Sequence, residues 1–203
     1  MSLENKPIIV NPHATEAQII WLHGLGASPE DFLFFQDAFP QFKFILPWAP
    51  MRHIDLWGQT LPGWFNISSL NREDDPNKNG ILDTHQMLEN IIDEISWPYF
   101  IGGFSQGAAQ ALFSSNLIKH APLGVIATSG YRPQHDFKET HQPPTLLLHG
   151  SYDDVVPLTF AKKSYSNLMK QDATESHWLP CAHCWHEDMD NLIQTFVNKH
   201  QTK

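Results

Sequence analysis

The segment Gly103-Phe104-Ser105-Gln106-Gly107 places a serine between two glycines, after the apolar stretch 97–102 and before a segment with helical periodicity. A strand, a sharp turn that carries a serine and then a helix make up a nucleophile elbow. The turn strains the backbone at the serine, and only small flanking residues let strand and helix approach so closely. The pattern therefore predicts Ser105 as a nucleophile in a cleft, although so short a motif also fits a plain glycine-rich turn.

A serine hydroxyl is a weak nucleophile until a base takes its proton, and a carboxylate must orient that base. In a fold with this elbow, the residues follow in the order serine, acid, histidine. We therefore predict Ser105 as nucleophile, His183 as general base and then general acid, and Asp153 as the orienting carboxylate. The competing candidates are Asp154 for the acid and His177 or His186 for the base.

The negative oxygen of a tetrahedral intermediate needs backbone N–H donors that are already in place. One is expected from Gln106, which follows the nucleophile at the start of a helix. The other should come from the loop after the second strand, where His23-Gly24-Leu25-Gly26 fits a tight turn that aims the Leu25 amide inward. Leu25 and Gln106 are thus the predicted oxyanion hole.

Residues 181–186, Cys-Ala-His-Cys-Trp-His, also contain the residue types of a metal or redox site. Two cysteines at C-x-x-C spacing with interleaved histidines make zinc conceivable. The ligands are crowded into one short segment, however, and His183 already has a better role. We therefore predict neither a metal nor a cofactor, and no working disulfide, because cytosolic thiols stay reduced.

Apolar runs alternate with segments of helical period along most of the chain. This alternation predicts a mostly parallel sheet of about seven strands with helices on both faces, and a site at the carboxyl ends of the strands. The predicted strands are 7–10, 18–22, 42–46, 99–102, 123–128, 145–148 and 175–179. The predicted helices are 29–39, 82–95, 108–119, 158–170 and 186–199.

The segment 47–80 shows no clear periodicity. Residues 47–70 are rich in Trp, Pro and Met and are expected to form a wall or lid over the cleft, whereas 71–79 is expected to be a solvated loop. A buried methylene contributes about 0.8 kcal/mol, so apolar side chains here could hold an acyl chain. The candidates are Trp57, Leu61, Trp64 and Phe65, with ordinary core packing as the alternative.

The composition is that of a globular protein, and 203 residues fit one domain, residues 1–203. A formal charge of −9 disfavours nucleic acid and anionic membranes as partners, because both are bound mainly through Lys and Arg. The chain shows neither a signal-like N-terminus nor an apolar run of about 20 residues, which predicts no integral membrane segment and a cytoplasmic location. Exposed aromatics in 47–70 would be compatible with a homodimer.

Together, these motifs resemble the phospholipase/carboxylesterase family of α/β-hydrolases, which includes the acyl-protein thioesterases. The resemblance runs from about residue 7 to the C-terminal helix. It implies an α/β-hydrolase fold without a separate cap domain and a cofactor-free serine esterase or thioesterase, with Leu25 and Gln106 lining the oxyanion hole. Besides the elbow and the 23–26 turn, it rests on Pro47-x-Ala49-Pro50-x-Arg52, Gly58, Trp64-Phe65-Asn66-Ile67 and His149-Gly150-x-x-Asp153-x-Val155-Val156-Pro157.

Two positions depart from the family pattern, which usually has Asp at the position of Asn66 and Gly at that of Ala182. Neither departure touches the triad, so both bear on specificity more than on activity. We expect a carboxylesterase acting on a small ester or acyl substrate, with longer acyl chains, in lysophospholipids or acyl-protein thioesters, as the alternative. A non-catalytic binding protein on the same fold is the remote alternative.

Overall fold

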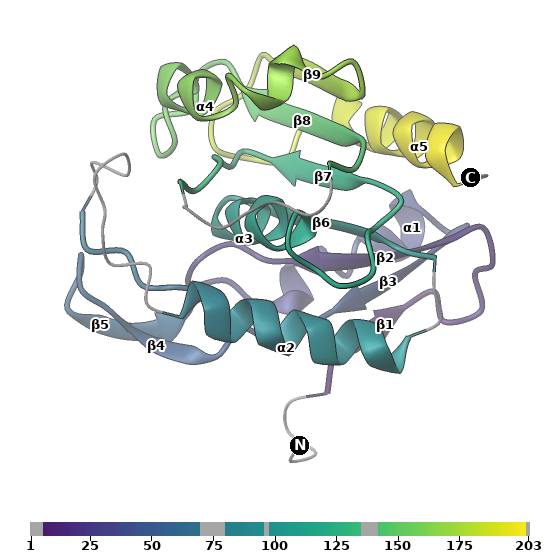
Figure 1. Ribbon diagram of the computed structural model, residues 1–203, viewed down its shortest axis with the longest axis horizontal. Helices are drawn as coiled ribbons and strands as arrows, with labels where there is room; N and C mark the ends of the chain where they lie inside the picture. The colour runs from purple at the N-terminus through teal and green to yellow at the C-terminus, as the bar shows by residue number, and fades with distance from the viewer. Residues whose placement is uncertain (1–5, 70–79, 96–97, 135–141, 202–203) are drawn as a thin grey trace.

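The computed structural model describes residues 6–69, 80–95, 98–134 and 142–201, and a seven-stranded sheet forms its centre (Figure 1). The strand order is β1-β3-β2-β6-β7-β8-β9. β1 pairs antiparallel with β3, and every other neighbouring pair is parallel. This confirms the predicted mostly parallel sheet. The strands are β1 (Ile8–Val10), β2 (Ala17–Leu22), β3 (Phe42–Leu46), β6 (Phe100–Phe104), β7 (Val125–Thr128), β8 (Thr145–Gly150) and β9 (Thr174–Leu179).

Helices cover both faces of the sheet, as predicted. α2 (Ile81–Glu94), α3 (Gln106–Ser115) and α4 (Leu158–Ser164) pack into one hydrophobic cluster, and α1 (Phe35–Ala38) and α5 (Asp188–His200) pack into another. Strand residues alternate between them: in β2, Ile20 belongs to the first cluster, and Ile19 and Trp21 belong to the second. Because both faces are covered, such strands read as continuous apolar runs.

Two predicted helices are each divided into shorter pieces. The expected helix 29–39 is a 3-10 turn, η2 (Pro29–Phe32), followed by the single turn of α1. The expected helix 158–170 is α4 followed by the 3-10 turn η3 (Leu168–Lys170). A 3-10 turn keeps apolar residues three apart, so the periodicity of the sequence does not show the break.

The segment 47–70 contains a hairpin that periodicity did not indicate. β4 (Met51–Ile54) and β5 (Gln59–Pro62) pair antiparallel, and Gly58 between them has a φ of 59°. The Gly26 amide donates a hydrogen bond to the carbonyl of Pro62 at 2.8 Å. The hairpin is therefore attached to the loop that follows β2. The expected solvated loop 71–79 lies outside the described residues.

No helix within the described ranges is long and apolar enough to cross a membrane. A bilayer-spanning helix needs about 20 residues, whereas the two longest helices, α2 and α5, have 14 and 13. The single-domain organisation of residues 1–203 stays a prediction.

Candidate active site

Ser105 lies in the sharp turn between β6 and α3. Its φ of 56° and ψ of −117° form a strained conformation that non-glycine residues rarely adopt. A Cβ atom on Gly107 would lie 2.1 Å from the carbonyl oxygen of Leu22, and one on Gly103 would lie 2.5 Å from the carbonyl carbon of Gly107. The two glycines therefore allow β2, β6 and α3 to meet, and the predicted elbow is present.

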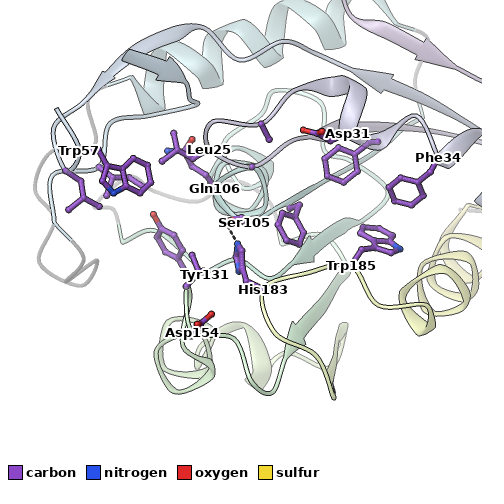
Figure 2. A pocket seen from close by; sticks show the side chains of 17 residues that line it. Leu25, Asp31, Phe34, Trp57, Ser105, Gln106, Tyr131, Asp154, His183 and Trp185 are labelled. Carbon is purple, nitrogen blue, oxygen red and sulfur yellow. Dashed lines mark hydrogen bonds between the residues drawn. The ribbon is translucent and has the colours of Figure 1, made fainter. Parts of the chain in front are cut away.

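His183 lies within hydrogen-bonding distance of both other residues predicted as a triad, although 78 residues separate it from Ser105 and 30 from Asp153 in sequence. The Nε2 atom of His183 is 2.9 Å from Ser105 Oγ (Figure 2), and its Nδ1 atom is 2.7 Å from Asp153 Oδ2. A neutral imidazole that donates from Nδ1 can accept the serine proton at Nε2. The competing candidates lie elsewhere: Asp154 on the cleft wall, His177 within β9, and His186 beside Asp188.

The Asp153 side chain is buried and held at both oxygens. Oδ1 accepts the amides of Val155 at 3.0 Å and Val156 at 2.7 Å, and Oδ2 faces His183. Burial acts to raise the pKa of Asp153, but hydrogen bonds from His183 and the Val156 amide outweigh it, so the pKa lies below its ordinary value. The carboxylate is therefore ionised at neutral pH and can stabilise an imidazolium.

A second buried histidine lies behind this carboxylate. His149 Nε2 is 2.8 Å from the carbonyl oxygen of Val156 and 3.4 Å from Asp153 Oδ2. Burial lowers the pKa of His149, so its imidazole is neutral at pH 7. The Nε2 atom therefore carries the proton that it donates to Val156.

Leu25 and Gln106, the predicted oxyanion hole, both line the cleft beside Ser105 (Figure 2). Gln106 is the first residue of α3, so its amide has no acceptor within the helix. In the loop after β2, the Gly26 amide bonds to Pro62 and the Ala27 amide bonds to Gly24. These bonds fix the backbone immediately after Leu25.

His23 holds the same loop from inside the protein. Its Nδ1 atom donates to the carbonyl of Gly24 at 2.8 Å, and its Nε2 atom accepts the amide of Ala49 at 3.2 Å. Burial lowers the pKa of His23, which fits a neutral ring whose Nε2 is an acceptor. The indole Nε1–H of Trp64 donates to the His23 carbonyl at 2.7 Å.

Of the four residues expected to hold an acyl chain, only Trp57 lines the cleft. Trp64 and Phe65 are buried in the core, which corrects that expectation. Their backbone is bound to the Gln106 side chain: Oε1 accepts the Trp64 amide at 2.9 Å, and Nε2 donates to the Phe65 carbonyl at 2.7 Å. Leu61 is half-buried behind Gly26, with its Cδ1 4.0 Å from where a Cβ on that glycine would lie.

The cleft has a volume of about 510 Å³ and extends to both sides of Ser105 (Figure 2). We call one side the hairpin arm and the other the aromatic arm. The hairpin arm comprises Leu25, Leu56, Trp57, Ile67 and Tyr131, and the aromatic arm comprises Asp31, Phe32, Phe34 and Trp185.

Most residues of the two arms were not predicted, although their position in the sequence carried a signal. Tyr131 lies three residues after the end of β7, and Trp185 follows His183 by two residues. Such positions, at or just beyond the carboxyl edge of the sheet, are where ligands bind.

The two departures from the family pattern have local explanations. Asn66 is buried, its Nδ2 donates to Asp55 Oδ2 at 2.7 Å, and its Oδ1 accepts the Asp55 amide at 3.0 Å. A carboxylate at position 66 would face that of Asp55, so an amide fits here. The adjacent residues of the hairpin arm are joined as well, since the Leu56 amide bonds to the Ile67 carbonyl at 2.9 Å. Ala182 is exposed and has no positive φ, so its position does not require glycine.

Cys181 and Cys184 are free thiols, the first buried and the second exposed. Burial and the neighbouring Cys184 raise the pKa of Cys181 to about 11. Across the part of the chain that the structure describes, no group of three or more His, Cys, Asp or Glu side chains is arranged to hold a metal ion.

Comparison with known proteins places these features in a family. A model of the phospholipase/carboxylesterase family matches residues 4–201. The chain is 33% identical to acyl-protein thioesterase 1 of Yarrowia lipolytica, with 78% of each chain covered, and 34% identical to that of Neurospora crassa, with 76% of this chain and 75% of the relative covered.

Solved structures show the same fold. Acyl-protein thioesterase 2 of Zea mays superimposes with a TM-score of 0.87 at 23% identity, covering 97% of this chain and 99% of that one. The Bacillus cereus carboxylesterase superimposes with a TM-score of 0.78 at 14% identity, covering 98% and 96%. The architecture is therefore that of an α/β-hydrolase.

Proposed function

Because the chain belongs to the phospholipase/carboxylesterase family of α/β-hydrolases, we propose that it hydrolyses carboxylic esters through an acyl-enzyme on Ser105. The observation that carries the proposal is the position of His183, with Nε2 2.9 Å from Ser105 Oγ and Nδ1 2.7 Å from Asp153 Oδ2. This geometry supports a base that takes the serine proton and a carboxylate that stabilises the resulting imidazolium.

In the acylation step, Ser105 Oγ attacks the ester carbonyl carbon while His183 Nε2 takes the hydroxyl proton. The negative oxygen that develops is directed at the amides of Leu25 and Gln106, and one such donor accounts for about 10²-fold to 10³-fold in rate. His183 then returns the proton to the leaving oxygen, the carbon–oxygen bond breaks, and the acyl group stays on Ser105.

In the deacylation step, water takes the place of the leaving alcohol beside His183. The imidazole removes a proton from this water as it attacks the acyl carbon, and the same two amides stabilise the second tetrahedral intermediate. Collapse of the intermediate returns the proton to Ser105 Oγ and releases the acid. The protein needs no cofactor for either step.

The hairpin arm is the proposed site of the acyl chain. Leu56, Trp57 and Ile67 supply an apolar lining, and Trp57 as a residue is 53% exposed, so a bound chain could cover it. Each methylene buried there contributes about 0.8 kcal/mol to binding.

Two observations favour a second candidate, hydrolysis of longer acyl chains in acyl-protein thioesters or lysophospholipids. The relatives in Yarrowia lipolytica and Neurospora crassa carry the name acyl-protein thioesterase 1. The hairpin arm also has the apolar lining that a long acyl chain would require.

One assay separates these candidates. Hydrolysis of p-nitrophenyl esters of increasing acyl length is measured for the wild type, Ser105→Ala and the control Ser151→Ala, whose serine is exposed outside the elbow. We expect Ser105→Ala to lower kcat by about 10⁴-fold or more and the control to match the wild type. A monotonic decline beyond butyrate would remove the long-chain candidate. A wild type without activity would overturn the proposal and favour a binding protein.

The cytoplasmic location and the homodimer are also proposals. The first is supported by the absence of a membrane-spanning helix in the described ranges, and the second by Met51 and Trp57, which are exposed on the hairpin. Cell fractionation tests the location, and light scattering of the purified chain tests the dimer.

A further inference from the structure

Three aromatic rings form one wall of the aromatic arm, opposite the hairpin arm across Ser105 (Figure 2). The ring centroids of Phe34 and Trp185 lie 5.4 Å apart with the planes at 73°, and those of Phe32 and Trp185 lie 6.3 Å apart. The ring of Phe34 is exposed, and that of Trp185 is half-buried. The arm therefore presents aromatic surface in the same cleft as Ser105, on the side away from the hairpin arm (Figure 2).

This wall is held in place before any ligand binds. The indole Nε1–H of Trp185 donates to Asp190 Oδ1 at 2.9 Å, and its ring packs against Phe35 at 5.4 Å and Trp21 at 5.8 Å. A ligand that contacts Trp185 does not have to order the indole first, which reduces the free-energy cost of binding.

The charges along the cleft are negative. Asp31 and Asp154 line it, and among its described lining residues there is no Lys or Arg. Asp31 lies at the aromatic arm (Figure 2), and a capping box holds it there, since its Oδ2 accepts the amide of Ser28 at 2.9 Å. A carboxylate next to aromatic rings attracts an alkylammonium group through both its charge and the ring faces, and it repels an anion.

We propose that the aromatic arm binds the leaving group of the ester and favours an alcohol that carries an alkylammonium group. This inference rests on the proposed ester hydrolysis. Since the hairpin arm takes the acyl chain, the alcohol extends to the other side of Ser105. There the proton on His183 Nε2 passes to the ester oxygen as the carbon–oxygen bond breaks, and the ammonium group lies against Phe34 and Trp185 near Asp31.

A pair of esters with the same shape and different charge tests the proposal. The probes are butyrylcholine and neohexyl butyrate, in which a carbon atom replaces the choline nitrogen, with p-nitrophenyl butyrate as the reference for general activity. We expect the wild type to hydrolyse butyrylcholine with a kcat/KM about tenfold higher than that of neohexyl butyrate, which corresponds to about 1.4 kcal/mol.

Asp31→Asn and Trp185→Leu should each reduce this ratio to about threefold or less, because each removes one of the two attractions. Asparagine at position 31 can still accept the Ser28 amide. Glu30→Gln is the matched control, since Glu30 is an exposed neighbouring carboxylate that does not line the cleft. The ratio is taken within each variant, so a partial loss of folded protein does not affect it.

Equal kcat/KM values for the two esters in the wild type would overturn the proposal. It would also be overturned if Asp154→Asn lowered the ratio and Asp31→Asn did not, or if p-nitrophenyl butyrate were hydrolysed and neither test ester were. Failure to hydrolyse all three esters would instead overturn the proposed function and, with it, this inference.

Discussion

Replacing Trp64 with phenylalanine should slow turnover without changing which acyl chains are preferred. Trp64 is fully buried, and its Nε1–H donates to the His23 carbonyl at 2.7 Å, two residues before the expected oxyanion donor Leu25. Phenylalanine retains a buried aromatic ring but has no N–H, so the His23 carbonyl loses its partner. The change therefore acts on the oxyanion loop and leaves the acyl site intact.

The expected magnitudes follow from that lost bond. A buried carbonyl left without a donor costs about 1–3 kcal/mol, which corresponds to a fall in Tm of roughly 3–10 °C for a chain of this size. Removal of one oxyanion donor lowers kcat by about 10²-fold to 10³-fold. Loosening the loop while its donor stays present should lower kcat by less than removing the donor. We therefore expect roughly a tenfold decrease in kcat with little change in KM.

Thermal unfolding and steady-state hydrolysis of p-nitrophenyl acetate, butyrate and octanoate measure both effects. Trp57→Leu is the matched control, because Trp57 is exposed and lines the hairpin arm. It should alter the ratio of the octanoate and acetate kcat/KM values and leave Tm within about 2 °C of the wild type. A Trp64→Phe variant with an unchanged Tm and an altered length preference would refute this reasoning and return Trp64 to the acyl site.

Three further substitutions test the buried polar groups. Asp153→Asn favours the wrong tautomer of His183, and kcat for p-nitrophenyl butyrate should fall by about 10⁴-fold. Asn66→Asp places a second carboxyl against Asp55, so urea unfolding at about pH 8 should show a loss of roughly 1–3 kcal/mol that shrinks near pH 5, where one carboxyl binds a proton. Burial lowers the pKa of His149, so below about pH 6.5 the unfolded chain binds more protons and stability falls as the pH falls. In His149→Gln, which retains a donor for Val156, that decline between about pH 6.5 and pH 5 should be smaller.

The sheet and the meeting of the three candidate triad residues could be predicted because the sequence signals for them are short in range or follow from topology. Continuous apolar runs mark strands that are covered on both faces, and the carboxyl ends of parallel strands meet at one edge. Ser105, Asp153 and His183 each follow such a strand, so their meeting needed no knowledge of side-chain packing.

The surroundings of the triad could not be predicted in the same way. Trp57 and Trp64 have the same chemistry and lie in one segment, yet the first is exposed in the cleft and the second is buried. What separates them is a set of bonds between distant residues, such as that from Trp64 Nε1 to His23 and that from the Trp64 amide to Gln106. The hydrophobicity of a residue indicates that its side chain favours apolar surroundings. It does not indicate whether that side chain lies in the core or in the lining of a cleft.

These same bonds join the two halves of the expected oxyanion hole. The Gln106 amide stands at the start of α3, while its side chain holds the backbone of Trp64 and Phe65. Trp64 in turn holds the loop of His23 and Leu25 through its indole. The segment that was expected to be a wall or lid therefore connects one donor to the other. We therefore expect a shift of residues 64 and 65 to disturb both predicted donors, so that this segment affects the rate of the chemical step as well as the choice of substrate.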